Sequence, residues 1–145
     1  MVILNINNVK KLYGSAKGVQ TEALSNINLS VNDGEFIAIM GESGSGKTTL
    51  LNIIATLDKP TEGTVTIKGK DIQKIKDKDI AAFRRNELGF VFQDFNLLDS
   101  FNNRDNIFLP LVLSNTKPSE MENRLGKIAP ILGIENLLNK FPYEI

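Results

Sequence analysis

The feature that most constrains the fold is a glycine-rich octapeptide, GESGSGKT at residues 41–48, which lies between two segments of different hydrophobic periodicity. The segment before it, residues 36–40 (FIAIM), is a continuous apolar run of the kind that forms a strand buried on both faces. After it, apolar residues recur at helical spacing at Leu50, Leu51, Ile53, Ile54 and Leu57. A strand, a glycine-rich turn and a helix in this order predict a loop that binds phosphate groups.

The chemistry of phosphate binding explains the residue types in the octapeptide. Polyphosphate is wrapped by backbone N–H groups, so the chain must turn sharply and approach closely, and glycine permits both. The helix expected to begin near Lys47 adds N–H groups and a dipole that favour anions. We expect Lys47 to contact the β- and γ-phosphates, Thr48 to offer its hydroxyl to Mg²⁺, and Thr49 to hydrogen-bond an α-phosphate oxygen.

The rest of the chain shows the periodicity of an α/β protein. Apolar and polar residues alternate in residues 2–6, 27–31 and 65–67, and turn signals separate these strands. Residues 89–92 (GFVF) are a second candidate for a strand buried on both faces. The early strands follow one another, while the later ones alternate with helices. This order predicts a small antiparallel β layer joined to a parallel α/β core.

Three further helices are expected, at residues 77–85, 103–113 and 119–133. Asp77 or Asp79 would cap the first of them. Pro110 is expected to bend the second. Ser119 and Glu122 have the spacing of a capping box at the start of the third.

Composition narrows the classes of function. The 145 residues fit one domain, and the 17 basic and 17 acidic side chains give a net charge of zero, which argues against a sequence-neutral nucleic-acid binder. Without cysteine there is no disulfide framework, and a reducing, cytoplasmic setting is expected. Without histidine there is no histidine base or histidine-ligated metal in these residues. The apolar stretches are far shorter than the ~20 residues that span a bilayer, so any membrane link is expected through a partner.

Several motifs resemble those of ABC-transporter ATPases. The phosphate loop with Thr49 and the two leucines after it, the turn LDKPTEG at residues 57–63 and the strand GFVFQ at residues 89–93 are similar to the family's motifs. Tyr13 occupies the place of the family's aromatic A-loop residue. The resemblance is closest to the macrolide-export, lipoprotein-release and bacitracin-efflux branch, through residues 83–85, 92–99 and 106–111, and residues 94–99 look most like the bacitracin-type exporters of antimicrobial peptides.

The resemblance implies an ABC-type P-loop NTPase fold and a set of site residues. Residues 1–145 would be the N-terminal part of one ABC ATPase domain, with the β layer and phosphate-loop core in residues 1–93 and the Q-loop and partial helical subdomain in residues 94–145. Tyr13 would stack on adenine, and Gln93 would approach Mg²⁺ and the attacking water and link the nucleotide to the membrane partner. The residues expected to bind ATP and Mg²⁺ are Tyr13, Gly41, Glu42, Ser43, Gly44, Ser45, Gly46, Lys47, Thr48, Thr49 and Gln93.

Two groups of residues are candidate surfaces, one apolar and one charged. By resemblance, an apolar region after the Q-loop would receive the coupling helix of the membrane subunit, although about half of its residues are expected to be core. These residues are Phe95, Leu97, Leu98, Phe101, Ile107, Phe108 and Leu111. Arg84 and Arg85 lie in a charge-rich stretch and are expected on a solvated helix face.

The last residues, FPYEI at 141–145, resemble the lead-in to the ABC signature, and the sequence ends there. The catalytic glutamate, the D-loop and the switch histidine of the family are therefore expected to be missing, so that this chain binds ATP without hydrolysing it. We also expect residues 36–40 and 90–92 to lack covering strands, which would make the isolated chain poorly soluble or partly unfolded.

The leading hypothesis is the ATP-binding subunit of an ABC exporter, in which two copies bind ATP and drive a transmembrane permease at the inner face of the cell membrane. Alternatives are a non-hydrolysing module that regulates an intact subunit, a soluble ABC ATPase outside transport, and an unrelated P-loop enzyme. The absence of an Asn/Thr-Lys-x-Asp guanine motif argues against a GTPase.

Overall fold

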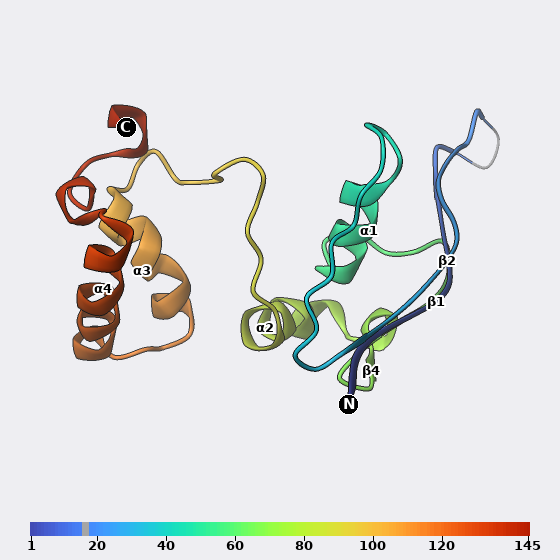
Figure 1. The fold of residues 1–145 in the computed structure, drawn as a ribbon, viewed down its shortest axis with the longest axis horizontal. Helices are drawn as coiled ribbons and strands as arrows, with labels where there is room; N and C mark the ends of the chain where they lie inside the picture. The colour runs from blue at the N-terminus through green and yellow to red at the C-terminus, as the bar shows by residue number, and fades with distance from the viewer. Residues whose placement is uncertain (16–17) are drawn as a thin grey trace. The chain divides into compact units, whose positions relative to one another are not determined.

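The computed structural model describes residues 1–15 and 18–145, which divide into two compact units, Met1–Leu88 and Gly89–Ile145 (Figure 1).

The first unit is built on a four-stranded antiparallel sheet in the order β2-β1-β3-β4. Its strands are β1 (Val2–Tyr13), β2 (Thr21–Asn32), β3 (Glu62–Ile67) and β4 (Lys70–Asp71). The side chains of Ile6, Val9 and Val65 are fully buried. Ile6 and Val9 lie three residues apart in β1, and the register shift between them brings both side chains to the core. The predicted antiparallel layer is thereby confirmed.

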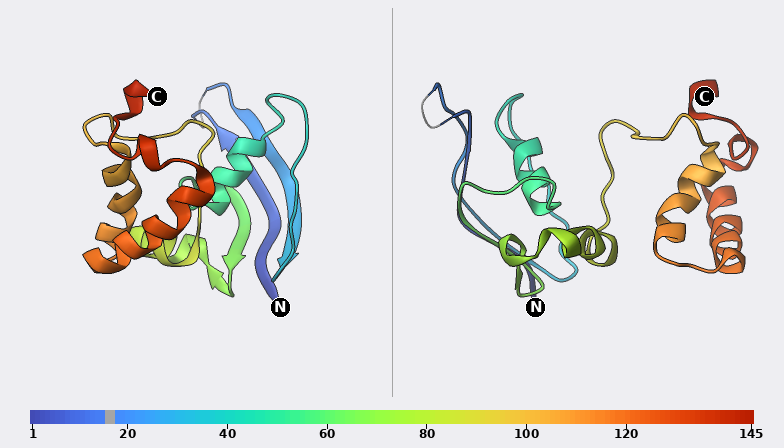
Figure 2. Two further views of the ribbon diagram at one scale, coloured as in Figure 1. Left: turned by 60° about the vertical axis from the view of Figure 1, so that its left-hand side comes forward. Right: turned by 180° about the vertical axis from the view of Figure 1, so that it is seen from behind.

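Two helices complete the core of this unit. Helix α1 (Lys47–Ile54) buries Leu50 and Ile53, and helix α2 (Asp77–Glu87) buries Phe83, all in one cluster with the sheet residues. The left view of Figure 2 shows α1 in front of the strands, where its apolar side packs against them. A short 3₁₀ turn, η1 (Ile72–Lys74), leads from β4 into α2.

The two segments predicted as strands of a parallel core do not form strands in the part of the chain that the structure describes. Residues 36–40 and 90–92 have no ladder partner there, and Phe36, Met40 and Val91 are 96%, 88% and 95% exposed. A strand needs a neighbour to satisfy its backbone N–H and C=O groups, and an apolar sequence alone does not supply one. The prediction of strands at these positions was therefore wrong for this chain, although the expectation that they would lie uncovered is met.

Two of the predicted helix caps also differ. The N-cap of α2 is Lys76, so Asp77 and Asp79 lie in the first turn, where their charge favours the helix dipole without capping it. Helix α4 (Pro118–Leu132) begins at Pro118, which has a backbone suited to the first helical position, and Ser119 makes no cap. The helix ends as expected at Gly133, which adopts a left-handed conformation with φ 66°.

The second unit pairs α4 with α3 (Asn103–Leu113), and the two helices lie side by side in both views of Figure 2. Pro110 lies inside α3, and Met121, Leu125 and Ala129 bury one face of α4. The 3₁₀ turns η2 (Glu135–Leu137) and η3 (Pro142–Glu144) follow. None of the helices in the described residues has the length and apolar character needed to cross a membrane.

The chain after α4 is fastened to the start of α3. The Asn103 side chain donates to the Leu137 carbonyl oxygen at 2.8 Å, and its backbone N–H donates to the Lys140 carbonyl oxygen at 2.8 Å. The Asn106 side chain donates to Leu98 O at 3.0 Å and accepts from Leu98 N at 2.8 Å, which fixes the loop that precedes α3. These two side-chain amides therefore hold the segment before α3 and the segment after α4 against α3.

Candidate functional site

The glycine-rich loop makes a sharp turn immediately before α1, which begins at Lys47 (Figure 1). Gly44 and Gly46 have φ values of 80° and 92°, in the left-handed region that only glycine enters at little cost. A Cβ at Gly46 would overlap the carbonyl oxygen of Ala23 and approach Leu24 Cδ2 to 2.9 Å. The close contact between loop and β2 therefore requires glycine at position 46.

The Lys47 ammonium lies within the loop and organises it. Its Nζ donates to the carbonyl oxygens of Gly41 at 2.8 Å and Glu42 at 2.6 Å, and to Ser45 Oγ at 3.2 Å. Each of these acceptors is a neutral oxygen. A phosphate oxygen carries negative charge, so it would attract the same cation more strongly than a neutral oxygen does.

The first turn of α1 supplies further donors. The bond from Leu50 N to Gly46 O, at 2.9 Å, is the first of the helix, so the N–H groups of Lys47, Thr48 and Thr49 precede the intrahelical ladder. The first turn contains no acidic side chain, and Gly46 provides no side-chain cap. The positive end of the helix dipole is therefore not offset by a local carboxylate, and it favours an anion.

Tyr13 lies at the end of β1 and takes part in a small polar cluster. Its hydroxyl donates to Asp58 Oδ2 at 2.8 Å, and Lys11 Nζ donates to Asp58 Oδ1 at 2.6 Å. The Lys11 ammonium also lies over the Tyr13 ring, 4.8 Å from its centroid. The ring is 43% exposed, so part of it stays open to a ligand.

The charge of Asp58 is stabilised by this cluster. Partial burial raises the pKa of its carboxyl, but the hydrogen bonds from Lys11, Tyr13 and the Lys59 backbone N–H outweigh burial, and the net effect lowers the pKa below its ordinary value. The carboxylate form is therefore the one that receives the Tyr13 hydroxyl.

Arg84 corrects a sequence-based expectation. It does not lie on a solvated helix face, because its guanidinium donates to the Thr56 carbonyl oxygen at 3.0 Å and is partly buried. Thr56 has φ 59°, and Arg84 satisfies the carbonyl that this turn leaves free at the end of α1. Arg85 is exposed, as predicted.

The structure thus gathers most of the predicted site residues around α1. The phosphate loop precedes this helix, and the turn that carries Asp58 and contacts Tyr13 follows it. Gln93 lies in the second unit, in an irregular segment, with an exposed side chain. Sequence analysis missed Asp58 and Lys11 as neighbours of Tyr13. The only available signal was Asp58 within the LDKPTEG motif, which by itself indicates a turn.

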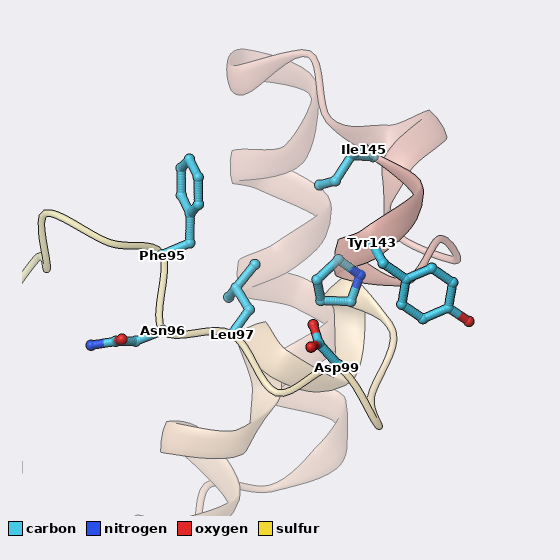
Figure 3. Close-up of a pocket in the computed structure, with 7 residues that line it drawn as sticks. Phe95, Asn96, Leu97, Asp99, Tyr143 and Ile145 are labelled. Carbon is cyan, nitrogen blue, oxygen red and sulfur yellow. The ribbon is translucent and has the colours of Figure 1, made fainter.

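The apolar residues after Gln93 line a pocket of about 440 Å³ within the second unit (Figure 3). Figure 3 shows Phe95 and Leu97 on the segment before α3, with Tyr143 and Ile145 on the C-terminal side of the same hollow. The full lining consists of Phe95, Asn96, Leu97, Asp99, Pro142, Tyr143 and Ile145. Phe108 and Leu111, which are half-buried, line a second pocket of about 420 Å³ between α3 and α4. None of the seven predicted apolar residues is buried, so the expectation that about half of them would be core is wrong for this chain.

Comparison with known proteins decides the family, since residues 24–144 match the family model described as ABC transporter. The chain belongs to the ABC transporter family. It is 53% identical, over its whole length, to the ABC transporter ATP-binding protein YvcR of Bacillus subtilis (strain 168), of which it covers 56%. It is 41% identical, again over its whole length, to the bacitracin export ATP-binding protein BceA of Halalkalibacterium halodurans, of which it covers 57%.

Solved ABC structures have the same fold. The dimeric structure of MJ0796, a bacterial ABC transporter cassette, matches with a TM-score of 0.90 at 37% identity, and the match covers 99% of this chain and 63% of that one. The chain thus spans a little over half the length of its ABC relatives. The resemblance to ATP-binding proteins of the bacitracin-export type and the ABC cassette fold with its antiparallel N-terminal sheet are both confirmed.

Proposed function

We propose that this chain carries the ATP-binding site of an ABC exporter subunit, with the phosphates in the loop at residues 41–48. The observation that supports this most strongly is the Lys47 ammonium, held inside the loop by three neutral oxygens at the dipole-positive end of α1. A cation bonded to the oxygens of a glycine-rich loop at a helix N-terminus suits a polyphosphate.

The proposed roles follow the chemistry of each group. Lys47 and the backbone N–H groups of the loop and first helical turn bind the phosphates. Thr48 offers a hydroxyl oxygen to Mg²⁺, and Gln93 offers an amide oxygen; both are hard donors of the kind Mg²⁺ prefers. Tyr13 stacks its open face on adenine. Hydrolysis of ATP is proposed for the whole subunit.

The proposed partners are a second ATPase subunit and a transmembrane permease, which would hold the subunit at the inner face of the cell membrane. The solved relative MJ0796 is dimeric, and BceA bears the name of a bacitracin exporter. Phe95, which is 90% exposed beside the pocket of Figure 3, offers an apolar surface to a helix of the permease. Export of an antimicrobial peptide is the transport reaction we propose.

The direct test of the proposed function is a calorimetric titration of the protein with Mg·ATP. We expect saturable binding that weakens at least about tenfold when EDTA removes Mg²⁺, since the ion neutralises the phosphates and joins them to Thr48. A protein that is folded by circular dichroism and yet shows no heat of binding would contradict the proposal.

Replacing Gln93 by alanine is expected to separate binding from hydrolysis in the whole subunit. Mg·ATP affinity should change by less than about threefold, because a water can replace the amide oxygen on Mg²⁺, while the rate of hydrolysis falls about tenfold or more, because the amide also acts on the attacking water. Gln73→Ala, in η1, is the matched control. Equal hydrolysis rates in Gln93→Ala and wild type would exclude this role.

A further inference from the structure

We propose that Asp58 is a positioning residue for the nucleotide base, because it fixes the ring of Tyr13 in the orientation that receives adenine. The inference rests on the proposed function and extends it to Asp58 and Lys11, to which no motif gives a role in binding. Its first support is the hydrogen bond from the Tyr13 hydroxyl to Asp58 Oδ2, at 2.8 Å. Tyr13 pairs with Thr21 at the end of β1, so this bond holds the far end of a ring that strand pairing alone leaves free to turn.

The Asp58 carboxylate is itself held in place. Lys11 Nζ donates to Asp58 Oδ1 at 2.6 Å and to the Lys59 carbonyl oxygen at 2.7 Å, and the Lys59 backbone N–H donates to Asp58 Oδ1 at 2.7 Å. The Lys11 and Asp58 side chains are only 11% and 29% exposed. A shielded ion pair with several hydrogen bonds keeps a defined geometry, unlike most pairs of exposed charges.

The turn that carries Asp58 is bonded to the helix that carries the phosphate loop. The backbone N–H groups of Leu57 and Asp58 donate to the Asn52 carbonyl oxygen at 2.9 and 3.2 Å, and Arg84 secures Thr56 from the other side. One end of α1 therefore presents the phosphate loop, and the turn at its other end fixes Tyr13. The base and phosphate subsites are thus joined through one rigid element.

Lys11 adds a restriction on how the base is bound. Its ammonium lies 4.8 Å from the centre of the Tyr13 ring and occupies one face of that ring. The opposite face is left for a stacked base. Since stacking depends on the whole aromatic face, a ring that turns away from this orientation forfeits contact with the base but not with the phosphates.

The test compares Mg·ATP with inorganic tripolyphosphate, which has no base, in calorimetric titrations of the protein. Asp58→Ala is expected to weaken Mg·ATP binding about fivefold and to leave Mg·tripolyphosphate binding unchanged, because only stacking is affected. Tyr13→Phe, which keeps the Lys11–Asp58 ion pair and removes only the hydroxyl, should give the same loss for Mg·ATP. Asp58→Ala should cost little more when it is added to Tyr13→Phe, because the two changes remove the same hydrogen bond. Lys59→Ala is the matched control, since among the described residues its ammonium pairs with the exposed Asp77 and not with Asp58.

Tyrosine fluorescence gives a readout that does not depend on affinity. The chain has two tyrosines and no tryptophan, so Tyr143→Phe leaves Tyr13 as the only emitter. A phenol that donates to a carboxylate emits weakly, and we expect Asp58→Ala to brighten the emission of this variant, while Lys59→Ala leaves it unchanged.

The outcomes separate this inference from the proposed function. If Tyr13→Ala weakens Mg·ATP binding but Tyr13→Phe and Asp58→Ala do not, stacking stands and the positioning role of Asp58 is overturned. If Asp58→Ala weakens Mg·ATP and Mg·tripolyphosphate equally, Asp58 acts on the fold, and the inference is again overturned. If Tyr13→Ala has no effect on Mg·ATP, the proposed stacking itself is wrong.

Discussion

Replacing Lys47 by alanine is expected to lower the affinity for Mg·ATP by at least about thirtyfold, because removing one partner of a shielded charge pair costs roughly 2–5 kcal/mol. The structure gives a second reason. The ammonium bonds to Gly41 O, Glu42 O and Ser45 Oγ before any ligand is bound, so the substitution also loosens the loop that presents its N–H groups. The measurement is a calorimetric titration of both proteins with Mg·ATP.

The control for this substitution is Lys74→Ala, which removes an equal charge from an exposed side chain that pairs with Asp71 three residues away. Its Mg·ATP affinity should stay within about twofold of wild type. Thermal melts should show that Lys47→Ala leaves the first unit folded, since the bonds of the ammonium are all within the loop. Tight Mg·ATP binding by Lys47→Ala would show that the phosphates bind outside the loop at residues 41–48.

Gly46→Ala is expected to destabilise the first unit by roughly 2–5 kcal/mol, from about 1–2 kcal/mol for a left-handed alanine and about 1–3 kcal/mol for overpacking. The added Cβ would overlap the Ala23 carbonyl oxygen and press on Leu24, which belongs to the buried core. Relief of the clash requires the loop to move away from β2, which also displaces the N-terminus of α1. Urea unfolding measures the first effect, and Mg·ATP titration should show a large loss of affinity.

Gly44→Ala is the matched control, since Gly44 shares the left-handed backbone with φ 80° but no described atom lies within 4 Å of its added Cβ. It should cost only the conformational penalty of about 1–2 kcal/mol. Equal free energies of unfolding for Gly44→Ala and Gly46→Ala would show that contact with β2 does not shape the loop.

The sequence predicts those parts of the structure that depend on local signals. Alternation in residues 2–6 and 27–31 predicts β1 and β2, and the glycines with Lys47 predict the phosphate loop and the helix after it. Both of these signals are local, because backbone conformation and hydrophobic periodicity are properties of a few neighbouring residues.

The rest of the structure depends on contacts between residues that are distant in sequence. The Tyr13–Asp58 bond joins residues 45 positions apart, and the Arg84–Thr56 bond joins residues 28 apart. No local pattern predicts such side-chain pairs. The apolar run at residues 36–40 fails as a strand for the same reason, since a strand exists only beside another one.

Hydrogen–deuterium exchange with and without saturating Mg·ATP shows whether the loop at residues 41–48 holds the phosphates of ATP. We expect slower exchange at the backbone N–H groups of residues 41–49, with Mg·tripolyphosphate giving the same protection. Saturated Mg·ATP binding with unchanged exchange in residues 41–49 would contradict it.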